Sequence, residues 1–144
     1  MIALLESAMR RFADRIAVND ERRQLTFRAL DEESARLASA IDRATEARTP
    51  LVIDVPRGTS QVVAVVAAIR AGRAAVPVDR SQPTSAAIIE GSGASHAIVT
   101  RDESLAVESL ADGCRGIECE NPLLYVLFTS GSTGTPKGVA MGPG

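Results

Sequence analysis

The sequence predicts a layered α/β domain in which helices cover a mostly parallel sheet. Short apolar runs typical of buried strands alternate with longer helical patterns along the chain, and this alternation favours parallel pairing with right-handed crossovers. The composition, with 45% hydrophobic and 24% charged residues in a chain of 144, is typical of a globular protein. We therefore expect residues 1–144 to form a single α/β unit.

Helical patterns dominate the first half of the chain. We expect a first helix over residues 4–12. Apolar residues then recur at helical spacing from Thr26 to about Ala44, with acidic residues near the N-terminal end, where the helix dipole stabilises them. Residues 62–69 are apolar on nearly every face, so their periodicity does not separate helix from strand. Their length, their alanines and the following Gly72 favour a helix that is buried on several sides.

Apolar runs predict the strands of the sheet. We expect strands over residues 51–55, 74–78, 96–100 and 122–128. A short helix over residues 84–90, ended by Gly91, and another over residues 104–110 complete the expected elements. The run 122–128 begins with a proline and leads directly into a segment of unusual composition.

That segment, TSGSTGTPKG at residues 129–138, combines hydroxyl groups, glycines and the one lysine among 16 basic residues. Glycine allows backbone N–H groups to approach an anion closely, and hydroxyl groups add donors from the sides. A lysine on a flexible stem adds a compact charge. The segment therefore predicts a phosphate-binding loop with these candidate contacts: Thr129, Ser130, Gly131, Ser132, Thr133, Gly134, Thr135 and Lys137.

Other interpretations of this segment depend on its spacing. The common nucleotide-binding loop places its lysine between a glycine and a hydroxyl residue, whereas Lys137 lies between Pro136 and Gly138. The nucleophile elbow needs a glycine at the position of Ser130. By residue type alone, a flexible hairpin connection or linker remains an alternative to phosphate binding.

The longer string LLYVLFTSGSTGTPKGVAM resembles the signature of the adenylate-forming enzymes, the superfamily of acyl-CoA synthetases, nonribosomal peptide synthetase adenylation domains and luciferases. Two weaker matches precede it, at Leu25–Leu30 (LTFRAL), which opens a helix in that family, and at Ala71–Asp79 (AGRAAVPVD). The resemblance covers most of residues 12–141. It implies the fold of the N-terminal subdomain of such an enzyme, a loop that binds the phosphates of ATP, Mg²⁺ bound with the nucleotide, and activation of a carboxylic or amino acid.

The resemblance also implies that parts of the enzyme lie outside this sequence. Family members use a carboxylate pocket, an acidic ribose-binding residue and a C-terminal domain with a second lysine, all later in the chain. We therefore expect a unit truncated just after the loop and inactive alone, and we assign it no catalytic residue. The remainder of the enzyme or a carrier protein is an expected partner. The identity of the acid, and of coenzyme A or a carrier protein as acceptor, stays open.

Two other classes of function remain as alternatives: a non-catalytic nucleotide-binding module and a protein-interaction module that pairs through an open sheet edge, for example as a homodimer. Several classes are disfavoured. A net charge of −2 with one tyrosine and three phenylalanines does not favour nucleic-acid binding. No apolar run approaches the ~20 residues of a membrane span. The N-terminus lacks the order of a secretory signal, so we expect a cytoplasmic protein. Cys114, Cys119 and His96 lack the neighbours of a metal site.

Overall fold

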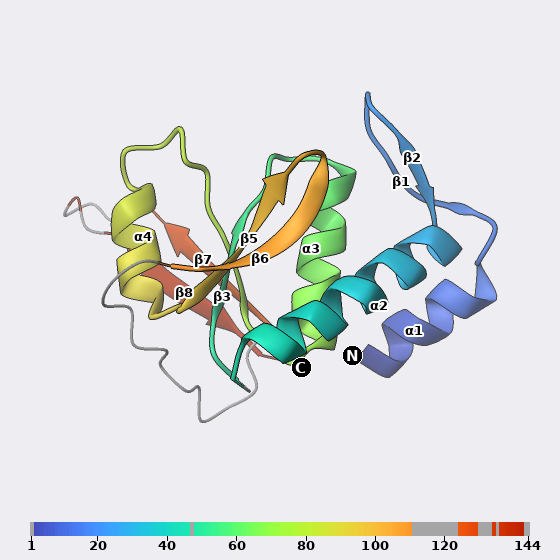
Figure 1. Ribbon diagram of the computed structural model, residues 1–144, viewed down its shortest axis with the longest axis horizontal. Coiled ribbons are helices and arrows are strands. Elements are labelled where there is room, and N and C mark those ends of the chain that lie inside the picture. Colours follow the sequence, from blue (N-terminus) through green and yellow to red (C-terminus); the bar gives the residue numbers. More distant parts are fainter. Residues whose placement is uncertain (1, 47, 111–123, 130–133, 135, 143–144) are drawn as a thin grey trace.

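The computed structural model of the protein describes all residues except 1, 47, 111–123, 130–133, 135 and 143–144 (Figure 1). Among the described residues, the largest sheet contains six strands. These strands are β3 (Leu51–Asp54), β4 (Ala75–Pro77), β5 (His96–Arg101), β6 (Ser104–Ser109), β7 (Tyr125–Thr129) and β8 (Lys137–Met141). A separate hairpin consists of β1 (Ile16–Asn19) and β2 (Gln24–Thr26). The helices are α1 (Ile2–Arg11), α2 (Phe27–Ala44), α3 (Thr59–Arg70) and α4 (Ser85–Ser92).

The sheet is parallel at its centre and antiparallel at both edges. Its strand order is β6-β5-β3-β4-β7-β8. The pairs β3–β5, β3–β4 and β4–β7 are parallel, whereas β5–β6 and β7–β8 are antiparallel. The predicted fold class, an α/β layer structure on a mostly parallel sheet, is therefore confirmed.

Helices cover both faces of the sheet, and successive residues of β3 point to opposite layers. Leu51 and Ile53 are fully buried in the larger core, which α1, α2 and α3 also form. Val52 is fully buried in a second core, against which Ile88 and Ile89 of α4 pack. Because parallel strands are buried on both faces, they read as continuous apolar runs in the sequence.

The predicted boundaries of α2 are confirmed, and the contacts at its two ends explain them. Thr26 is its N-cap, and the Thr26 hydroxyl oxygen accepts a hydrogen bond from the backbone N–H of Ala29 at 3.2 Å. Beyond α2, the guanidinium of Arg73 is almost completely buried. It donates to the Asp42 carboxylate at 2.6 Å, to the Thr45 carbonyl at 2.9 Å and to the Ala71 carbonyl. Arg73 therefore ties the end of α2 to the turn before β4.

One predicted element was wrong in type, and the end of a predicted helix lies two residues further along the chain. Residues 104–110, expected as a short helix, contain the strand β6, whose Leu105 and Val107 pack on the larger core. The two-residue turn at Asp102 and Glu103, both with positive φ, joins β6 to β5 without the glycine or asparagine that usually marks such turns. The helix α4 also passes through Gly91 and ends at Gly93, which is left-handed with φ of 66°.

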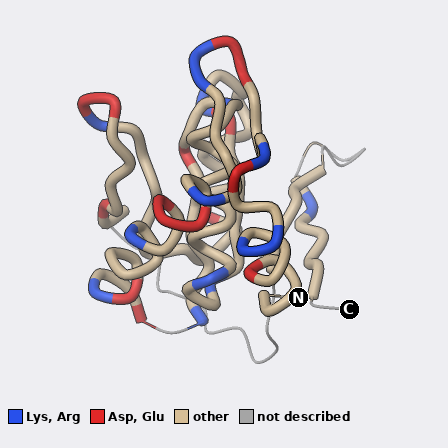
Figure 2. Tube along the Cα trace, turned by 90° about the vertical axis from the view of Figure 1, so that its right-hand side faces the viewer, with Lys and Arg blue, Asp and Glu red and all other residues tan. Residues whose placement is uncertain are grey.

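Three strands had no counterpart in the sequence-based expectations. These are β1 and β2, which are short, and β8, which begins within the predicted loop. Charged residues of both signs crowd the turn of the β1–β2 hairpin, at the top of the molecule in both views (Figures 1 and 2). In the described part of the chain, no helix is both long and apolar enough to cross a bilayer.

Candidate functional site

The predicted phosphate-binding segment connects the strands of the β7–β8 hairpin. Thr129 is the last residue of β7, and Lys137 is the first residue of β8 and its direct cross-strand partner. The Thr129 hydroxyl lies 3.5 Å from the Lys137 carbonyl, a long contact. Gly134 has a φ of 81° and is exposed. The other candidates, Ser130, Gly131, Ser132, Thr133 and Thr135, lie outside the described residues.

Alternating residues give the hairpin two different faces. Val126 and Phe128 pack against the core on the α4 side. Gly138 lies in β8, and a Cβ at this position would be only 3.3 Å from the Phe128 ring. A side chain there would displace the ring. The glycine therefore serves the packing of the hairpin.

The opposite face of the hairpin is largely uncovered. Lys137, Val139 and Met141 share this face with Leu127, and all four are exposed. Tyr125, at the other end of β7, is partly buried against the larger core, and this burial raises the pKa of its hydroxyl. Lys137, a predicted phosphate contact, thus lies at the end of an exposed apolar strip.

The direction of β7 places the start of the segment at the carboxyl edge of the parallel strands. Because β7 is parallel to β4, and β4 to β3, Thr129 lies at the same edge of the sheet as the carboxyl ends of the central strands. In open α/β sheets, ligands bind outside this edge. No Asp or Glu occurs in residues 121–144, so the segment carries no charge that would repel a phosphate.

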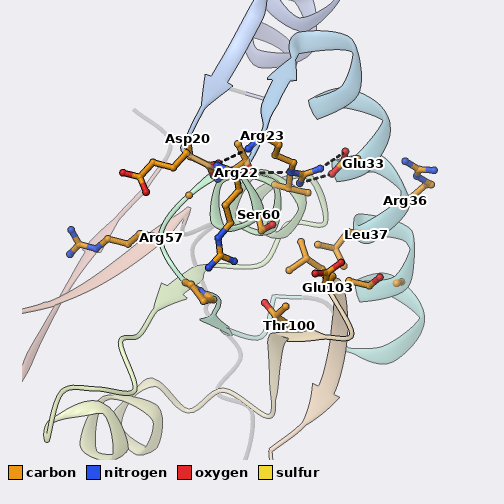
Figure 3. A pocket seen from close by; sticks show the side chains of 18 residues that line it. Asp20, Arg22, Arg23, Glu33, Arg36, Leu37, Arg57, Ser60, Thr100 and Glu103 are labelled. Carbon is orange, nitrogen blue, oxygen red and sulfur yellow. Dashed lines mark hydrogen bonds and ion pairs between the residues drawn. The ribbon is translucent and has the colours of Figure 1, made fainter.

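The same edge carries a groove that the sequence did not indicate (Figure 3). It has a volume of about 1100 Å³ and opens between the β1–β2 turn, α2, the start of α3 and the β5–β6 turn. The signals present in the sequence were the charged run at residues 20–23 and the segment that follows β3, residues 56–60. Neither has a recognisable spacing, because the groove is assembled from four separate segments.

One wall of the groove is a closed hydrogen-bond network. The Asp20 carboxylate accepts from the backbone N–H of Thr59 at 2.6 Å, of Arg23 at 2.9 Å and of Arg22 at 2.8 Å. These three amides hold the pKa of Asp20 far below its ordinary value. Arg23 in turn donates to the Thr59 hydroxyl at 3.0 Å and to both carboxylate oxygens of Glu33 at 3.0 and 3.1 Å.

The two upstream matches, Leu25–Leu30 and Ala71–Asp79, form parts of the scaffold: the start of α2 and the strand β4. Leu25 is buried and Thr26 caps α2, so the first element does open a helix. The second element contains β4 and ends at Asp79, whose carboxylate accepts from the Ser81 hydroxyl at 2.6 Å and the Ser81 N–H at 2.9 Å. These bonds lower the pKa of Asp79.

Candidate metal ligands are not assembled in the described ranges. No group of three or more His, Cys, Asp and Glu side chains suited to a metal ion occurs there. Half-buried His96 begins β5, and its Nδ1 lies 2.9 Å from the Ser95 hydroxyl. Cys114 and Cys119 lie outside the described residues.

The strand order and the position of the hairpin describe an open α/β sheet, and comparison with known proteins gives the family. The family of AMP-binding enzymes matches residues 5–121, and the chain belongs to this family. The matched range ends before the predicted phosphate-binding segment, residues 129–138.

Similar proteins include nonribosomal peptide synthetases and related synthases. Nonribosomal peptide synthetase agiA of Aspergillus flavus is 34% identical over 94% of this chain and 2% of its own length. Zwittermicin A synthase ZmaJ of Bacillus cereus is 33% identical over 94% of this chain and 30% of its own length. The chain therefore spans less than a third of these relatives.

A solved structure shows the same fold. The N-terminal subdomain of NpsA from Klebsiella oxytoca superposes with a TM-score of 0.76 at 23% identity, over 97% of this chain and 41% of that one. The same NpsA subdomain has been solved in complex with 3-hydroxyanthranilyl-AMSN. The predicted correspondence to the N-terminal subdomain of an adenylate-forming enzyme is thus confirmed.

Proposed function

We propose that the chain supplies the ATP phosphate-binding loop of an enzyme that activates a carboxylic or amino acid as its adenylate. The observation that carries this proposal is the hairpin, which holds Thr129 opposite Lys137 at the carboxyl edge of a parallel sheet. Two donor groups on facing strands then flank the entrance and exit of a loop rich in hydroxyl groups and glycine. Membership in the AMP-binding family supports a nucleotide as the ligand.

In this reaction a carboxylate oxygen of the acid forms a bond to the α-phosphorus of ATP, and the bond from that phosphorus to pyrophosphate breaks. The task of the loop is to align the β- and γ-phosphates and to stabilise the negative charge that develops on the leaving pyrophosphate. Residues 129–135 and Lys137 would make these contacts. Mg²⁺ fits as an ion carried by the phosphates, because residues 121–144 offer hydroxyl ligands but no carboxylate.

The acid-binding pocket and the remaining catalytic groups belong, in this proposal, to polypeptide that the present chain does not contain. The chain covers 30% of ZmaJ and 41% of the NpsA subdomain, which leaves room for them. We expect no ATP–pyrophosphate exchange from the isolated chain with any acid of a broad panel. Robust exchange would overturn this part of the proposal.

The acid and the acceptor follow from the relatives only as proposals. Several relatives are peptide synthetases, which favours an amino acid as the activated substrate. NpsA has been solved in an artificial fusion of adenylation and PCP domains with ThdA, and a carrier domain is the acceptor we propose here. The cytoplasmic location stays a prediction.

The phosphate-binding role is tested by calorimetry with Mg-ATP on the wild type and on Lys137→Ala. Loss of a charged phosphate contact at an exposed site should weaken binding about tenfold, or about 1.4 kcal/mol. Arg43→Ala is a matched control, because Arg43 is an exposed cation at the far end of α2. Equal affinities for all three proteins would contradict the proposal. Binding that leaves the NMR resonances of the β7–β8 hairpin unchanged would contradict it as well.

We further propose that β8 pairs with β8 of a second copy when the isolated chain is concentrated. All five residues of β8 are exposed, and β8 is one of the two edge strands of the sheet in the described part of the chain. Antiparallel pairing centred on Val139 would place Lys137 opposite Met141 of the second copy, so the two lysines would not meet. Sedimentation should show a dimer that Val139→Lys disrupts; a monomer at the highest accessible concentration would contradict it.

A further inference from the structure

The groove at the carboxyl edge lies where the chain reverses its direction of travel across the sheet. From β3 the chain passes through α3 to β4 on one side, whereas β5 lies on the other side of β3 and continues to β6 at that edge. The loops that leave β3 and β5 therefore diverge, and residues from both line the groove. Such a switch point is where open α/β sheets form ligand crevices.

Some charged groups that line the groove have hydrogen-bond or ion-pair partners, and others have none among the described residues. Asp20, Arg23 and Glu33 bind one another or the backbone, as described above, and so form a preorganised wall. Arg22 and Glu103 have no ion-pair partner among the residues that the structure describes. Figure 3 shows both side chains directed into the groove from different walls, whereas Arg36 and Arg57 point away from it.

The groups that face the groove therefore include one cation, one anion and two hydroxyls. Arg22 offers planar N–H donors suited to a carboxylate, and Glu103 offers acceptors suited to an ammonium group. Ser60 and Thr100 add hydroxyl groups. A ligand that carries both charges can pair with Arg22 and Glu103 at the same time, whereas an apolar ligand would leave both charges unpaired.

We propose that this groove binds a small zwitterionic molecule, with its carboxylate at Arg22 and its ammonium group at Glu103. The site is separate from the phosphate-binding hairpin, because β4 lies between β3, which leads into the groove, and β7, which carries the loop. The proposal does not depend on the nucleotide function. It gives the AMP-binding unit a second ligand site on the same edge of the sheet.

Titration of the ¹⁵N-labelled chain with triglycine tests the site, because triglycine carries both charges on a short backbone. We expect saturable shifts of amide resonances at residues 20–23, 58–60 and 100–105. N-acetylated triglycine and triglycine amide each lack one charge and should bind about tenfold more weakly, as expected for loss of one charge-assisted contact. Shifts that never saturate, or that spread evenly over the surface, would overturn the proposal.

Substitutions assign the two ends of the ligand. Arg22→Gln should abolish the advantage of triglycine over triglycine amide, and Glu103→Gln should abolish its advantage over the acetylated form. Arg43→Gln and Glu90→Gln, exposed residues outside the groove, are the matched controls and should bind as the wild type does. Unchanged discrimination in Arg22→Gln and Glu103→Gln would overturn the proposal. Lys137→Ala should leave triglycine binding intact, so failure of the nucleotide proposal would be seen separately.

Discussion

The region around β3 and the β7–β8 hairpin belong to one sheet but differ in how completely they are packed. Leu51, Val52 and Ile53 have no solvent-accessible surface, whereas every residue of β8 is exposed. Folding stability and the predicted ligand contacts therefore reside in separate parts of this chain. Segments that bind ligands are commonly drawn from the less stable end of a structure, and the hairpin fits that description.

The largest effect of a single substitution is expected in the core. Ile53→Ala removes a fully buried side chain between the sheet and the larger helical layer. We expect a loss of about 2–5 kcal/mol in the free energy of unfolding, measured by urea denaturation with circular dichroism. Ile53→Val should cost about 0.5–1.5 kcal/mol and keeps the test readable if the alanine variant does not fold.

A surface substitution calibrates that result. Leu4 on α1 is 77% exposed, so Leu4→Ala should change the free energy of unfolding by less than about 0.5 kcal/mol. Similar losses for Ile53→Ala and Leu4→Ala would show that β3 does not form the core in solution.

The second effect concerns the junction between β3 and α3. Gly58 has a φ of 140° and a ψ of −163°, a conformation that is essentially restricted to glycine. A Cβ at this position would lie 2.5 Å from Oδ2 of Asp20. We expect Gly58→Ala to cost about 1–3 kcal/mol, from the backbone conformation alone, in thermal or urea unfolding.

Gly91→Ala is the matched control for that substitution. Gly91 lies inside α4, and its added Cβ would meet Phe128 at 3.7 Å, an ordinary contact. Because alanine is the better helix former, we expect a gain of about 0.5–1 kcal/mol. A loss at Gly91 and none at Gly58 would contradict the described backbone.

The contrast between β3 and the hairpin also explains which features are predictable from the sequence. The apolar runs of β3, β4 and β5 and the capped pattern of α2 are local signals, and they are enough to predict the fold class. Residues 104–109 contain too few alternations to outweigh helical propensity, so the sequence favours a helix where β6 lies. The pairing of β6 depends on a turn at Asp102 and Glu103, in which Glu103 occupies the position that usually holds a glycine.

The candidate sites differ in the same way. The predicted phosphate-binding segment is contiguous, so its composition and the resemblance of the longer string around it are local signals that can be found in the sequence. The groove brings residue 20 to residue 59 and residue 23 to residue 33. Such contacts between distant segments depend on the packing of the hairpin β1–β2 against α2 and α3. No local pattern encodes them, and the groove therefore has no signature in the sequence.

A third effect depends on pH and concerns the wall of the groove. The pKa of Asp20 in the folded chain lies far below its ordinary value near 3.8. Its contribution to stability is therefore present above about pH 4 and is lost as pH falls toward the folded pKa. We expect Asp20→Asn to be less stable than the wild type at pH 6, and the difference in urea midpoint to shrink at pH 3.

Asp14→Asn is the control, because Asp14 pairs with Arg28 on the surface and takes no part in the groove. Its difference from the wild type should be small at both values of pH. A wild-type advantage over Asp20→Asn that grew on acidification would contradict a lowered pKa for Asp20.

The smallest effect on stability is expected in the hairpin itself. Val139 is 52% exposed on the uncovered face, so Val139→Thr removes little buried apolar surface. We expect a change below about 0.5 kcal/mol in the free energy of unfolding of the monomer, measured at low protein concentration. The same substitution should raise the concentration at which the chain self-associates, because it makes the exposed strip Leu127, Val139 and Met141 less apolar. A large loss of stability without any change in association would mean that the hairpin is packed as tightly as β3, and the division between a stable core and an exposed binding edge would fail.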